Sequence, residues 1–283
     1  MRKYINMLLV AIIFQAGIYI YFDRVMLVPA ANFSQQIITE GSKESPDPQK
    51  VSTDQKYCVR LQTNGVSFYT ADNRIVKEVP LEEEESVSYF SWVPNTHLAL
   101  IGICTDTSKG TNITLKSINL DTNSLPQEPK INGLAKGAKL ENVAFSPQTN
   151  VTYIMVSSKT SKSIYRTDAN NHLTKVFTSS SVLRIACLQS VDMLLYDNKQ
   201  DKSIYSLSNN GKRKMVSPKS GKYVLIGSDK DDNIYIGKLN SSGLVTTVLK
   251  GTITGNYKEF KALINPCPQS SIIISYEGKL TLN

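Results

Sequence analysis

The chain has 283 residues and a net charge of +8, and 41% of its residues are hydrophobic. That length allows one large domain or two small ones, and that apolar content can bury a core, which argues against wholesale disorder. The basic residues are scattered, with no run of five or more, whereas a nucleic-acid surface normally clusters its charge on one face. Nucleic acid is therefore not expected as a partner.

The first 24 residues have the pattern of a membrane anchor. Arg2 and Lys3 precede an apolar stretch of about 18 residues, a length at the lower edge of a membrane span, which Asp23 and Arg24 end. A cleaved signal peptide is the alternative, but the small residues at 28–32 lie beyond that charged pair. The sequence favours an uncleaved signal-anchor transmembrane helix over 1–24, with Arg2 and Lys3 in the cytoplasm and the rest extracytoplasmic.

The next segment differs in composition from what precedes and follows it. Residues 33–56 are polar and rich in Ser, Pro, Asp and Lys, which is typical of a flexible tether. We therefore expect a flexible polar stalk over 25–56 and a folded domain over 57–283.

The folded part repeats a unit of apolar strand, turn and apolar strand. Its clearest copy is ENVAFSPQTNVTYIMVSS at 141–158, and SYFSWVPNTHLALIGI at 88–103 has the same form. Weaker copies lie at 182–198, at 222–238 and at 260–278, where Asn265-Pro266 is expected to form the turn. Recurrence of one unit is the mark of a repeat architecture.

A second motif, a hairpin with an Asn-rich turn, follows the first. It occurs at 66–79, 113–131, 163–177 and 203–216, and its turn residues favour the positive φ that tight hairpins need. Six apolar residues mark this motif along the chain, at spacings of 30 to 49 positions that mostly exceed 40: Phe68, Leu115, Ile164, Ile204, Ile234 and Leu280.

Short strands, frequent turn signals and no helical periodicity predict an all-β protein. A period of about 40 to 50 residues, with about four strands per unit, is that of a β-propeller. Residues 57–283 hold five or six such units, so the predicted fold is a five- or six-bladed β-propeller preceded by one N-terminal transmembrane helix. A β-sandwich is the competing fold, but it gives no reason for the Phe-Ser-x-Pro turn to recur.

Two of these copies resemble the TolB-type propeller repeat. The matching residues are Phe145-Ser146-Pro147 with the strand 151–156, and Phe90 to Pro94 with the strand 98–103. The repeat is also similar to blades of the N-terminal propeller in dipeptidyl-peptidase-IV-like and prolyl-oligopeptidase-like proteins. The family's usual Asp-Gly-Lys after the proline is absent here. The resemblance implies a propeller without the α/β-hydrolase domain that those peptidases carry, so their activity is not implied.

No catalytic constellation is visible in the sequence. The two histidines, His97 and His172, lie in turns of different units without metal-ligand spacing, and both are expected to be solvent-exposed turn residues. The sequence contains no Gly-x-Ser-x-Gly elbow, no Ser-x-x-Lys pair and no Gly-rich phosphate loop. We therefore assign no catalytic, cofactor-binding or metal-binding residues and expect a protein that is not an enzyme.

Two acidic segments have an alternative interpretation. Asp229, Asp231 and Asn233 have calcium-loop spacing, but Ile234 and Asn240 stand where such a loop needs Gly and Glu. A solvated acidic turn is therefore favoured over a calcium site. The four glutamates at 82–85 are expected to form a solvated loop between blades rather than a face for a basic partner.

The cysteines are spaced too widely for a zinc knuckle or a Cys-x-x-Cys redox site. Cys187 aligns with Phe145 in the first strand of its unit and is expected in the core. A bridge between Cys58 and Cys267 could help to close the ring, and the sequence leaves open the disulfide state of all four residues: Cys58, Cys104, Cys187 and Cys267.

Together these features predict a membrane-anchored, extracytoplasmic β-propeller that acts as a non-catalytic protein-binding or scaffolding module of the cell envelope. Its expected partners are the membrane, through the N-terminal helix, and a protein of the envelope. The alternative is a propeller enzyme, or a metal-dependent sugar- or peptide-binding protein, with its site in the central channel. The sequence does not identify the ligand.

Overall fold

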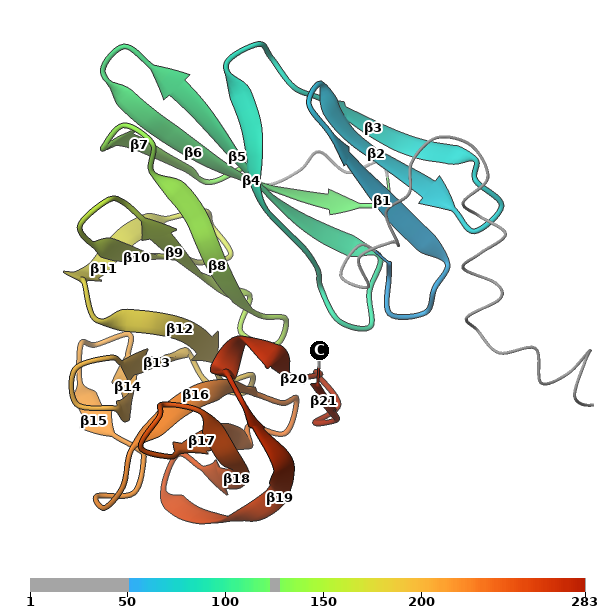
Figure 1. Ribbon diagram of the computed structural model, residues 1–283. Coiled ribbons are helices and arrows are strands. Elements are labelled where there is room, and N and C mark those ends of the chain that lie inside the picture. Colours follow the sequence, from blue (N-terminus) through green and yellow to red (C-terminus); the bar gives the residue numbers. More distant parts are fainter. Residues whose placement is uncertain (1–50, 123–127, 283) are drawn as a thin grey trace, which may run out of the picture.

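The computed structural model describes residues 51–122 and 128–282, and these residues form antiparallel strands joined by short turns (Figure 1). The predicted signal-anchor and most of the predicted stalk, up to residue 50, lie outside the described residues. Within the described part of the chain, no helix is long and apolar enough to cross a membrane.

Consecutive strands form five sheets and a C-terminal hairpin. Sheet I contains β1 (Tyr57–Gln62), β2 (Gly65–Thr70) and β3 (Ile75–Pro80). Sheet II contains β4 (Glu85–Trp92), β5 (Leu98–Thr107), β6 (Gly110–Asn119) and β7 (Lys130–Leu134). Sheet III contains β8 (Lys139–Ser146), β9 (Val151–Ser157), β10 (Lys162–Thr167) and β11 (Leu173–Ser179).

The remaining strands continue the same order. Sheet IV contains β12 (Val182–Cys187), β13 (Met193–Asn198), β14 (Ser203–Ser208) and β15 (Arg213–Met215). Sheet V contains β16 (Tyr223–Ser228), β17 (Ile234–Leu239), β18 (Val245–Thr252) and β19 (Gly255–Cys267). A short 3₁₀ helix, η3 (Gln269–Ser271), leads to the C-terminal hairpin of β20 (Ile272–Ile274) and β21 (Leu280–Leu282).

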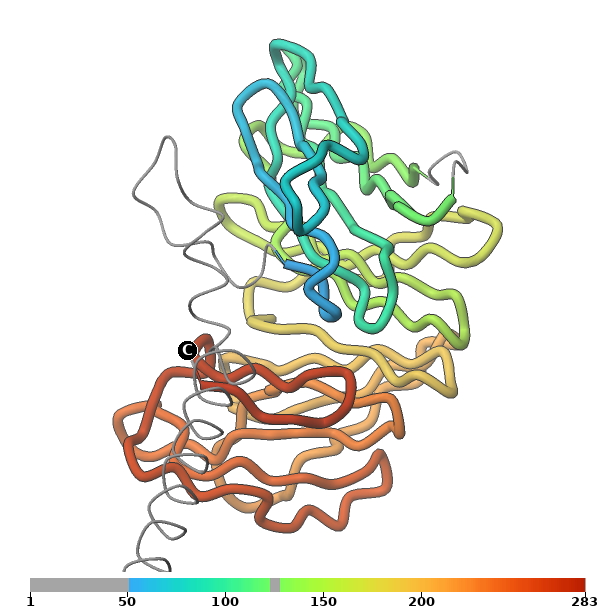
Figure 2. The backbone as a smooth tube through the Cα atoms, turned by 90° about the vertical axis from the view of Figure 1, so that its right-hand side faces the viewer, coloured from blue at the N-terminus to red at the C-terminus, as the bar shows by residue number. Residues whose placement is uncertain are grey.

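The sheets follow one another around a common centre in chain order, from sheet I in blue to the C-terminal hairpin in red (Figure 1). Figure 2 shows the same succession from the side, and no sheet takes a strand from another part of the chain. The first strands of sheets II to V, together with β20, line a central cavity. This radial arrangement confirms the predicted all-β propeller and excludes a sandwich, in which two sheets would share one core.

The second strand of each four-stranded sheet is buried on both faces. In β5, Ile101 packs against sheet I, while Leu100 and Cys104 point the other way, toward sheet III. In β9, Ile154 packs toward sheet II and Tyr153 toward sheet IV. Strands buried on both faces have almost continuous apolar sequences, which is why these segments were recognisable as repeats.

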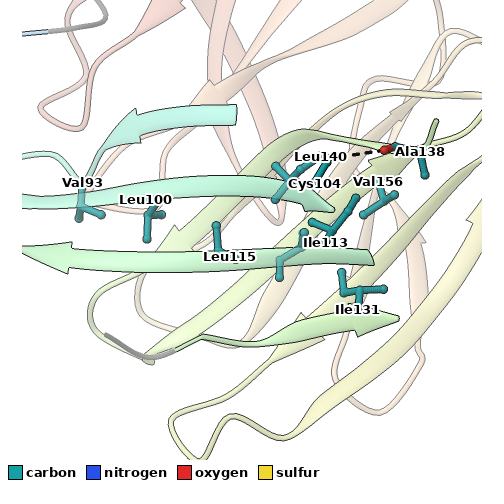
Figure 3. Close-up of a cluster of buried hydrophobic side chains, with 10 residues drawn as sticks. Val93, Leu100, Cys104, Ile113, Leu115, Ile131, Ala138, Leu140 and Val156 are labelled. Carbon is teal, nitrogen blue, oxygen red and sulfur yellow. Dashed lines mark hydrogen bonds between the residues drawn. The ribbon is translucent and has the colours of Figure 1, made fainter. Parts of the chain in front are cut away.

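The core is therefore divided into separate clusters, and each cluster joins two neighbouring units. Figure 3 shows the cluster between sheets II and III, where Leu140 and Val156 of sheet III meet Ile113 and Leu115 of sheet II. The Cys104 thiol also contacts the carbonyl of Ala138 at 3.6 Å across this boundary. The last cluster joins sheet V to Ile272 of β20.

The predicted second-motif turns at 66–79, 163–177 and 203–216 are confirmed, while that of 113–131 includes residues outside the described part of the chain. Asn73, Asn171 and Gly211, in the turns of the second motif, have φ values of 62°, 58° and 79°. Asn95 and Asn150, in turns of the first motif, have φ values of 57° and 53°. Asparagine and glycine tolerate this left-handed region better than other residues, so the Asn-rich composition sets the turn geometry.

The prediction of a turn at Asn265-Pro266 is wrong. Both residues lie within β19, and the chain turns later, through η3. The register of β18 with β19 shifts between Thr247↔Ala262 and Val245↔Cys267, so Pro266 lies in an irregular part of an edge strand, where its missing N–H is tolerated. The first-motif turn of this last unit is instead the one between β20 and β21.

Two of the six markers were also assigned to the wrong strand. Leu115, Ile164 and Ile204 lie in the third strand of their sheets, after the first-motif hairpin, but Ile234 and Leu280 lie in the second strand of such a hairpin. The fully buried Val248 of β18 is the counterpart in sheet V, and it lies 44 positions after Ile204. The short spacing of 30 positions between Ile204 and Ile234 therefore arose because a third strand was compared with a second strand.

One buried carboxylate connects three elements near the centre. Asp197, at the end of β13, is 1% exposed, and its Oδ1 accepts hydrogen bonds from the backbone N–H groups of Leu183 and Arg184. Its Oδ2 accepts from Leu225 N of β16 and from Gln269 Nε2 of η3, the latter at 2.8 Å. Four donors therefore compensate for the loss of water around this charge.

The Arg184 side chain adds a second polar connection at the same place. Its guanidinium donates to the carbonyl oxygens of Ile226, Gln269 and Ile272, which belong to sheet V, η3 and β20. Burial lowers the pKa of Arg184. Arg184 and Asp197 thus join sheet IV to both sheet V and the C-terminal hairpin through directed hydrogen bonds.

The packing between sheets predicts which isoleucines stabilise the fold. Ile154→Ala, at a fully buried position between sheets II and III, should lower the free energy of unfolding by about 2–5 kcal/mol because it leaves a cavity. Ile264→Ala makes the same chemical change on β19, where the side chain is 97% exposed, and should change it by less than about 0.5 kcal/mol. Chemical denaturation of the purified chain measures both; equal effects would contradict the inter-sheet core.

Candidate functional site

Turns of neighbouring units are hydrogen-bonded to one another at one end of the central cavity. Ser146 donates to the carbonyl of Gln189 at 2.9 Å, which joins the turns of sheets III and IV. The Asp232 carboxylate of sheet V accepts from the N–H groups of Gln189 and Ser190 and from the Ser190 hydroxyl. We call these hydrogen-bonded turns of sheets III, IV and V the collar. The Ser146-Pro147 turn, which made the repeat recognisable, is one part of it.

The C-terminal hairpin extends the collar to sheet II. Glu277, in the β20–β21 turn, pairs with Lys230 of sheet V and accepts from Asn95 of sheet II, both at 2.6 Å. The hydrogen bonds from Lys230 and then Asn95 lower the pKa of Glu277. The collar therefore runs from sheet III through IV, V and the hairpin to sheet II.

The central cavity has a volume of about 260 Å³ and a mixed lining, in which Ser91, Gln189 and Ser228 lie beside apolar residues. Cys187 is buried there, as predicted, and burial raises the pKa of its thiol to about 12, so it stays protonated and unreactive at neutral pH. Trp92 Nε1 and Gln189 Oε1, which belong to residues lining the cavity, are buried without a hydrogen-bond partner among the described residues. These two atoms are the polar groups of the cavity that a small ligand could satisfy.

The prediction that His97 is a solvent-exposed turn residue is wrong. Its side chain is 20% exposed and lies between two carboxylates: Nε2 is 2.8 Å from Asp54 Oδ2 and Nδ1 is 2.7 Å from Asp121 Oδ1. The hydrogen bonds to Asp54 and Asp121 raise the pKa of His97. Partial burial acts to raise the pKa of Asp54, but hydrogen bonds from His97, Ser52 and the Lys56 N–H outweigh it and lower that pKa to about 2.

This ion-paired cluster attaches the segment before β1 to sheet II. Residues 51–56 also contact sheet I, through a bridge between Val51 and Cys58 and a hydrogen bond from Tyr57 N to Ser52 Oγ. The Tyr57 ring packs edge-on against His97, with 4.8 Å between ring centroids. Sequence could not reveal this cluster because its three charged members are 24 and 43 positions apart.

Asp229, considered above as a calcium ligand, is not solvated. It is 2% exposed, and its oxygens accept from Asp231 N, from Asn233 N and Nδ2, and from the Tyr235 hydroxyl. Those hydrogen bonds outweigh burial and lower the pKa of Asp229. The carboxylate therefore orders its own turn, while Asp231 is exposed as expected. Within residues 51–122 and 128–282, no three His, Cys, Asp or Glu side chains gather as a metal site.

Other predictions for individual residues have mixed outcomes. The glutamates at 82–84 are exposed between β3 and β4, as expected for a loop between blades. His172 is exposed in the β10–β11 hairpin, as expected. Cys58 and Cys267 are not bridged, and all four cysteines are free thiols.

A larger cleft lies between sheets III and IV and has a volume of about 730 Å³. It opens along β11 on one side and along β13 to β15 on the other. Aromatic rings form a ladder beside it: Phe177 and Tyr196 have centroids 5.0 Å apart, and Tyr196 stacks on Tyr205 at 5.7 Å. Arg213 covers the other end of the ladder, with its guanidinium carbon 3.7 Å from the Tyr205 ring centroid.

A second arginine is held inside the cleft by a buried network. Arg166 Nη2 lies 2.6 Å from Asp192 Oδ2, and Tyr153 donates to Asp192 Oδ1 at 2.5 Å. The hydrogen bond to Asp192 raises the pKa of Arg166, and burial, reinforced by Asp192, raises the pKa of Tyr153. Asp192 thus fixes the position of a permanent positive charge at the cleft wall.

None of the cleft residues was singled out from sequence. The available signal was that the second-motif hairpins at 163–177 and 203–216 are consecutive copies, so they face each other across one gap between sheets. Both copies carry basic residues: Arg166 and Lys175 in the first, Arg213 in the second. What sequence could not show is that the short β15 and the aromatic ladder leave that gap open.

Comparison with known proteins supports the fold. No protein-family model matches the chain, and no curated protein matches it. Among solved structures, prolyl oligopeptidase B from Galerina marginata aligns with a TM-score of 0.51 at 12% identity, over 81% of this chain and 37% of its own. Porphyromonas gingivalis dipeptidyl peptidase 4 aligns with a TM-score of 0.49 at 11% identity, over 76% of this chain and 38% of its own. Virginiamycin B lyase from Staphylococcus aureus aligns with a TM-score of 0.49 at 13% identity, over 80% of this chain and 74% of its own.

Such low identities show the fold alone. The chain has the fold of a β-propeller, to which its alignment with prolyl oligopeptidase B adds a similarity of fold, and its described residues contain no hydrolase domain. It spans less than two-fifths of the length of the two peptidases.

The His97 cluster predicts a dependence of stability on pH. The folded pKa of His97 is above its ordinary value of about 6.5, so its contribution is complete below that pH and is lost as pH rises through the folded pKa. Because both carboxylates are about half exposed, the loss should be about 1 kcal/mol or less.

Thermal unfolding between pH 5.5 and 9 tests this. The Tm difference between the natural chain and His97→Gln should be largest at pH 5.5 and should shrink as pH rises. His172→Gln, which changes an exposed histidine, should follow the natural chain throughout. A His97→Gln difference that is constant across the range would contradict the charged form of this cluster.

Proposed function

We propose that this chain is a membrane-anchored, extracytoplasmic β-propeller that binds a partner protein in the cell envelope and does not catalyse a reaction. The apolar segment with Arg2 and Lys3 before it supports the anchor and its orientation. The polar composition of residues 33–56 supports a tether that holds the propeller away from the membrane.

The observation that carries the binding role is the cleft between sheets III and IV. Its volume of about 730 Å³ is within the range of ligand-binding clefts. Tyrosine and arginine are enriched where binding energy concentrates in protein interfaces, and here Tyr196 and Arg213 line the same cleft. Hydroxyl and amide groups on its rim, including Ser179, Ser208 and Asn209, can pair with a partner's polar groups.

We further propose that the propeller has five blades. The first strands of sheets II to V and β20 line the central cavity, and sheet I contributes no residue to that lining. Sheet I therefore lacks an inner strand, while the C-terminal hairpin lacks outer strands. On this proposal β20 is the inner strand of the fifth blade and the three strands of sheet I are its outer strands, so the beginning and the end of the domain share one blade.

A small-molecule site in the central cavity is a second candidate. The unpaired Trp92 N–H and the unpaired Gln189 amide oxygen supply one donor and one acceptor in a cavity that polar and apolar residues line together. This candidate predicts a co-purifying small molecule that Trp92→Phe abolishes, whereas the protein-binding proposal predicts no dependence on Trp92.

Photo-crosslinking in the native envelope tests the protein-binding role. The crosslinking residue benzoyl-phenylalanine in place of Asn209, on the cleft rim, should give one discrete adduct with a partner protein. The same residue in place of Lys258, exposed on the edge strand β19, should give none and is the matched control. Failure to form an adduct from position 209, or the same adduct from both positions, would contradict the proposal.

A further inference from the structure

We infer that the cleft between sheets III and IV receives an extended, acidic peptide segment that also carries apolar side chains. This inference deepens the proposed protein-binding function, on which it rests, by giving the chemistry of the partner. It depends on three properties of the cleft: its charge, the state of Arg213 and the edge of β11.

The charge of the cleft has one sign. Arg166, Lys175 and Arg213 line it, and no Asp or Glu does. Asp192 and Asp168 pair with Arg166 from outside that lining, at 2.6 Å and 3.8 Å, and offset its charge, so the net positive charge comes from Lys175 and Arg213. The remaining positive charge favours an anionic ligand and disfavours a cationic one.

Arg213 is positioned to bind a carboxylate. Its guanidinium stacks on Tyr205 through its face and also hydrogen-bonds the Tyr196 side chain, so part of its set of N–H donors is left for a ligand. No carboxylate lies within 4.0 Å of it in the part of the chain that the structure describes. Stacking reduces the freedom of this long side chain before a ligand arrives, which lowers the entropy cost of binding.

The edge of β11 indicates an extended peptide. Residues 174–179 all line the cleft, although successive residues of a strand point to opposite faces of the sheet. The cleft must therefore run along the edge of this strand, which is the outermost strand of sheet III. A free strand edge can pair with the backbone of an extended peptide.

The apolar part of the lining distinguishes a peptide from other polyanions. Val176, Phe177, Val182 and Leu207 line the cleft beside the basic residues. A peptide can place apolar side chains on these residues while its carboxylates reach Arg213 and Lys175. Polyphosphate and acidic polysaccharide have no apolar side chains to bury, so they gain less from this surface.

Fluorescence polarisation of the full-length chain in detergent tests the inference. The probe is a fluorescein-labelled random copolymer of glutamate and tyrosine, compared with labelled polyglutamate, polyphosphate and heparin. We expect the glutamate–tyrosine copolymer to bind more tightly than the other three. Arg213→Ala should weaken its binding about tenfold, because it removes a charge-assisted hydrogen bond.

Lys214→Ala is the matched control. It removes the same charge from the next residue of β15, whose side chain points to the opposite face and does not line the cleft. It should change the affinity less than twofold, whereas Arg213→Lys should retain part of the binding. Equal losses in Arg213→Ala and Lys214→Ala would overturn the inference, because they would indicate attraction by net charge alone.

Two other results would also overturn it: tighter binding of heparin or polyphosphate than of the copolymer, or no saturable binding of the copolymer. Failure here is distinguishable from failure of the proposed function. An adduct from position 209 combined with no effect of Arg213→Ala would leave a protein-binding cleft that recognises another kind of segment. No adduct, combined with Arg213-dependent peptide binding, would instead contradict the envelope partner.

Discussion

Each four-stranded sheet of this protein has two apolar faces, and both must be removed from water. The constraint is clearest in the second strand of each four-stranded sheet, where successive residues point to opposite faces and belong to different core clusters. In β9, Ile154 belongs to the cluster with sheet II and Tyr153 to the cluster with sheet IV. A sheet of this kind cannot be the end of a stack, because its second face would remain exposed. Arranging the sheets around a centre gives each one two neighbours, and the divided core follows directly.

The same arrangement creates the sites. Neighbouring sheets pack tightly near the centre, where the first strands of sheets II to V converge on a cavity of about 260 Å³. Toward the outside the neighbouring sheets diverge. The gap between two sheets is then filled only where their outer strands are long enough to place side chains in it. Between sheets III and IV the outer strand β15 has three residues, and the cleft with its aromatic ladder and Arg213 occupies that gap.

Hydrogen bonds and ion pairs made by polar side chains supplement the apolar packing between sheets, which by itself has no directional preference. Asp197 and Arg184 join sheets IV and V to the C-terminal hairpin, and Glu277 joins that hairpin to sheet II. Asp54, His97 and Asp121 fasten the segment before β1 to sheet II. Each of these bonds fixes how two units are placed relative to each other, which apolar contact alone leaves less defined.

The sequence by itself determined the repeat, the strands and most turns. Apolar residues on both faces gave continuous apolar runs, and the Asn-rich turns specified positive φ at residues such as Asn73 and Asn171. These signals are local, so they are readable without the fold. The turn placed at Asn265-Pro266 failed because proline also suits an edge strand, and whether a strand is at an edge depends on its neighbours.

Only the tertiary structure decided where chemistry gathers. His97 was assigned to solvent because its carboxylate partners, Asp54 and Asp121, are distant in sequence and meet it only when sheet II and the segment before β1 come together. Arg166, Lys175 and Arg213 belong to hairpins that are separate in sequence and face each other across one gap. Local patterns encode strands and turns, but a site formed between units depends on distances that only packing sets.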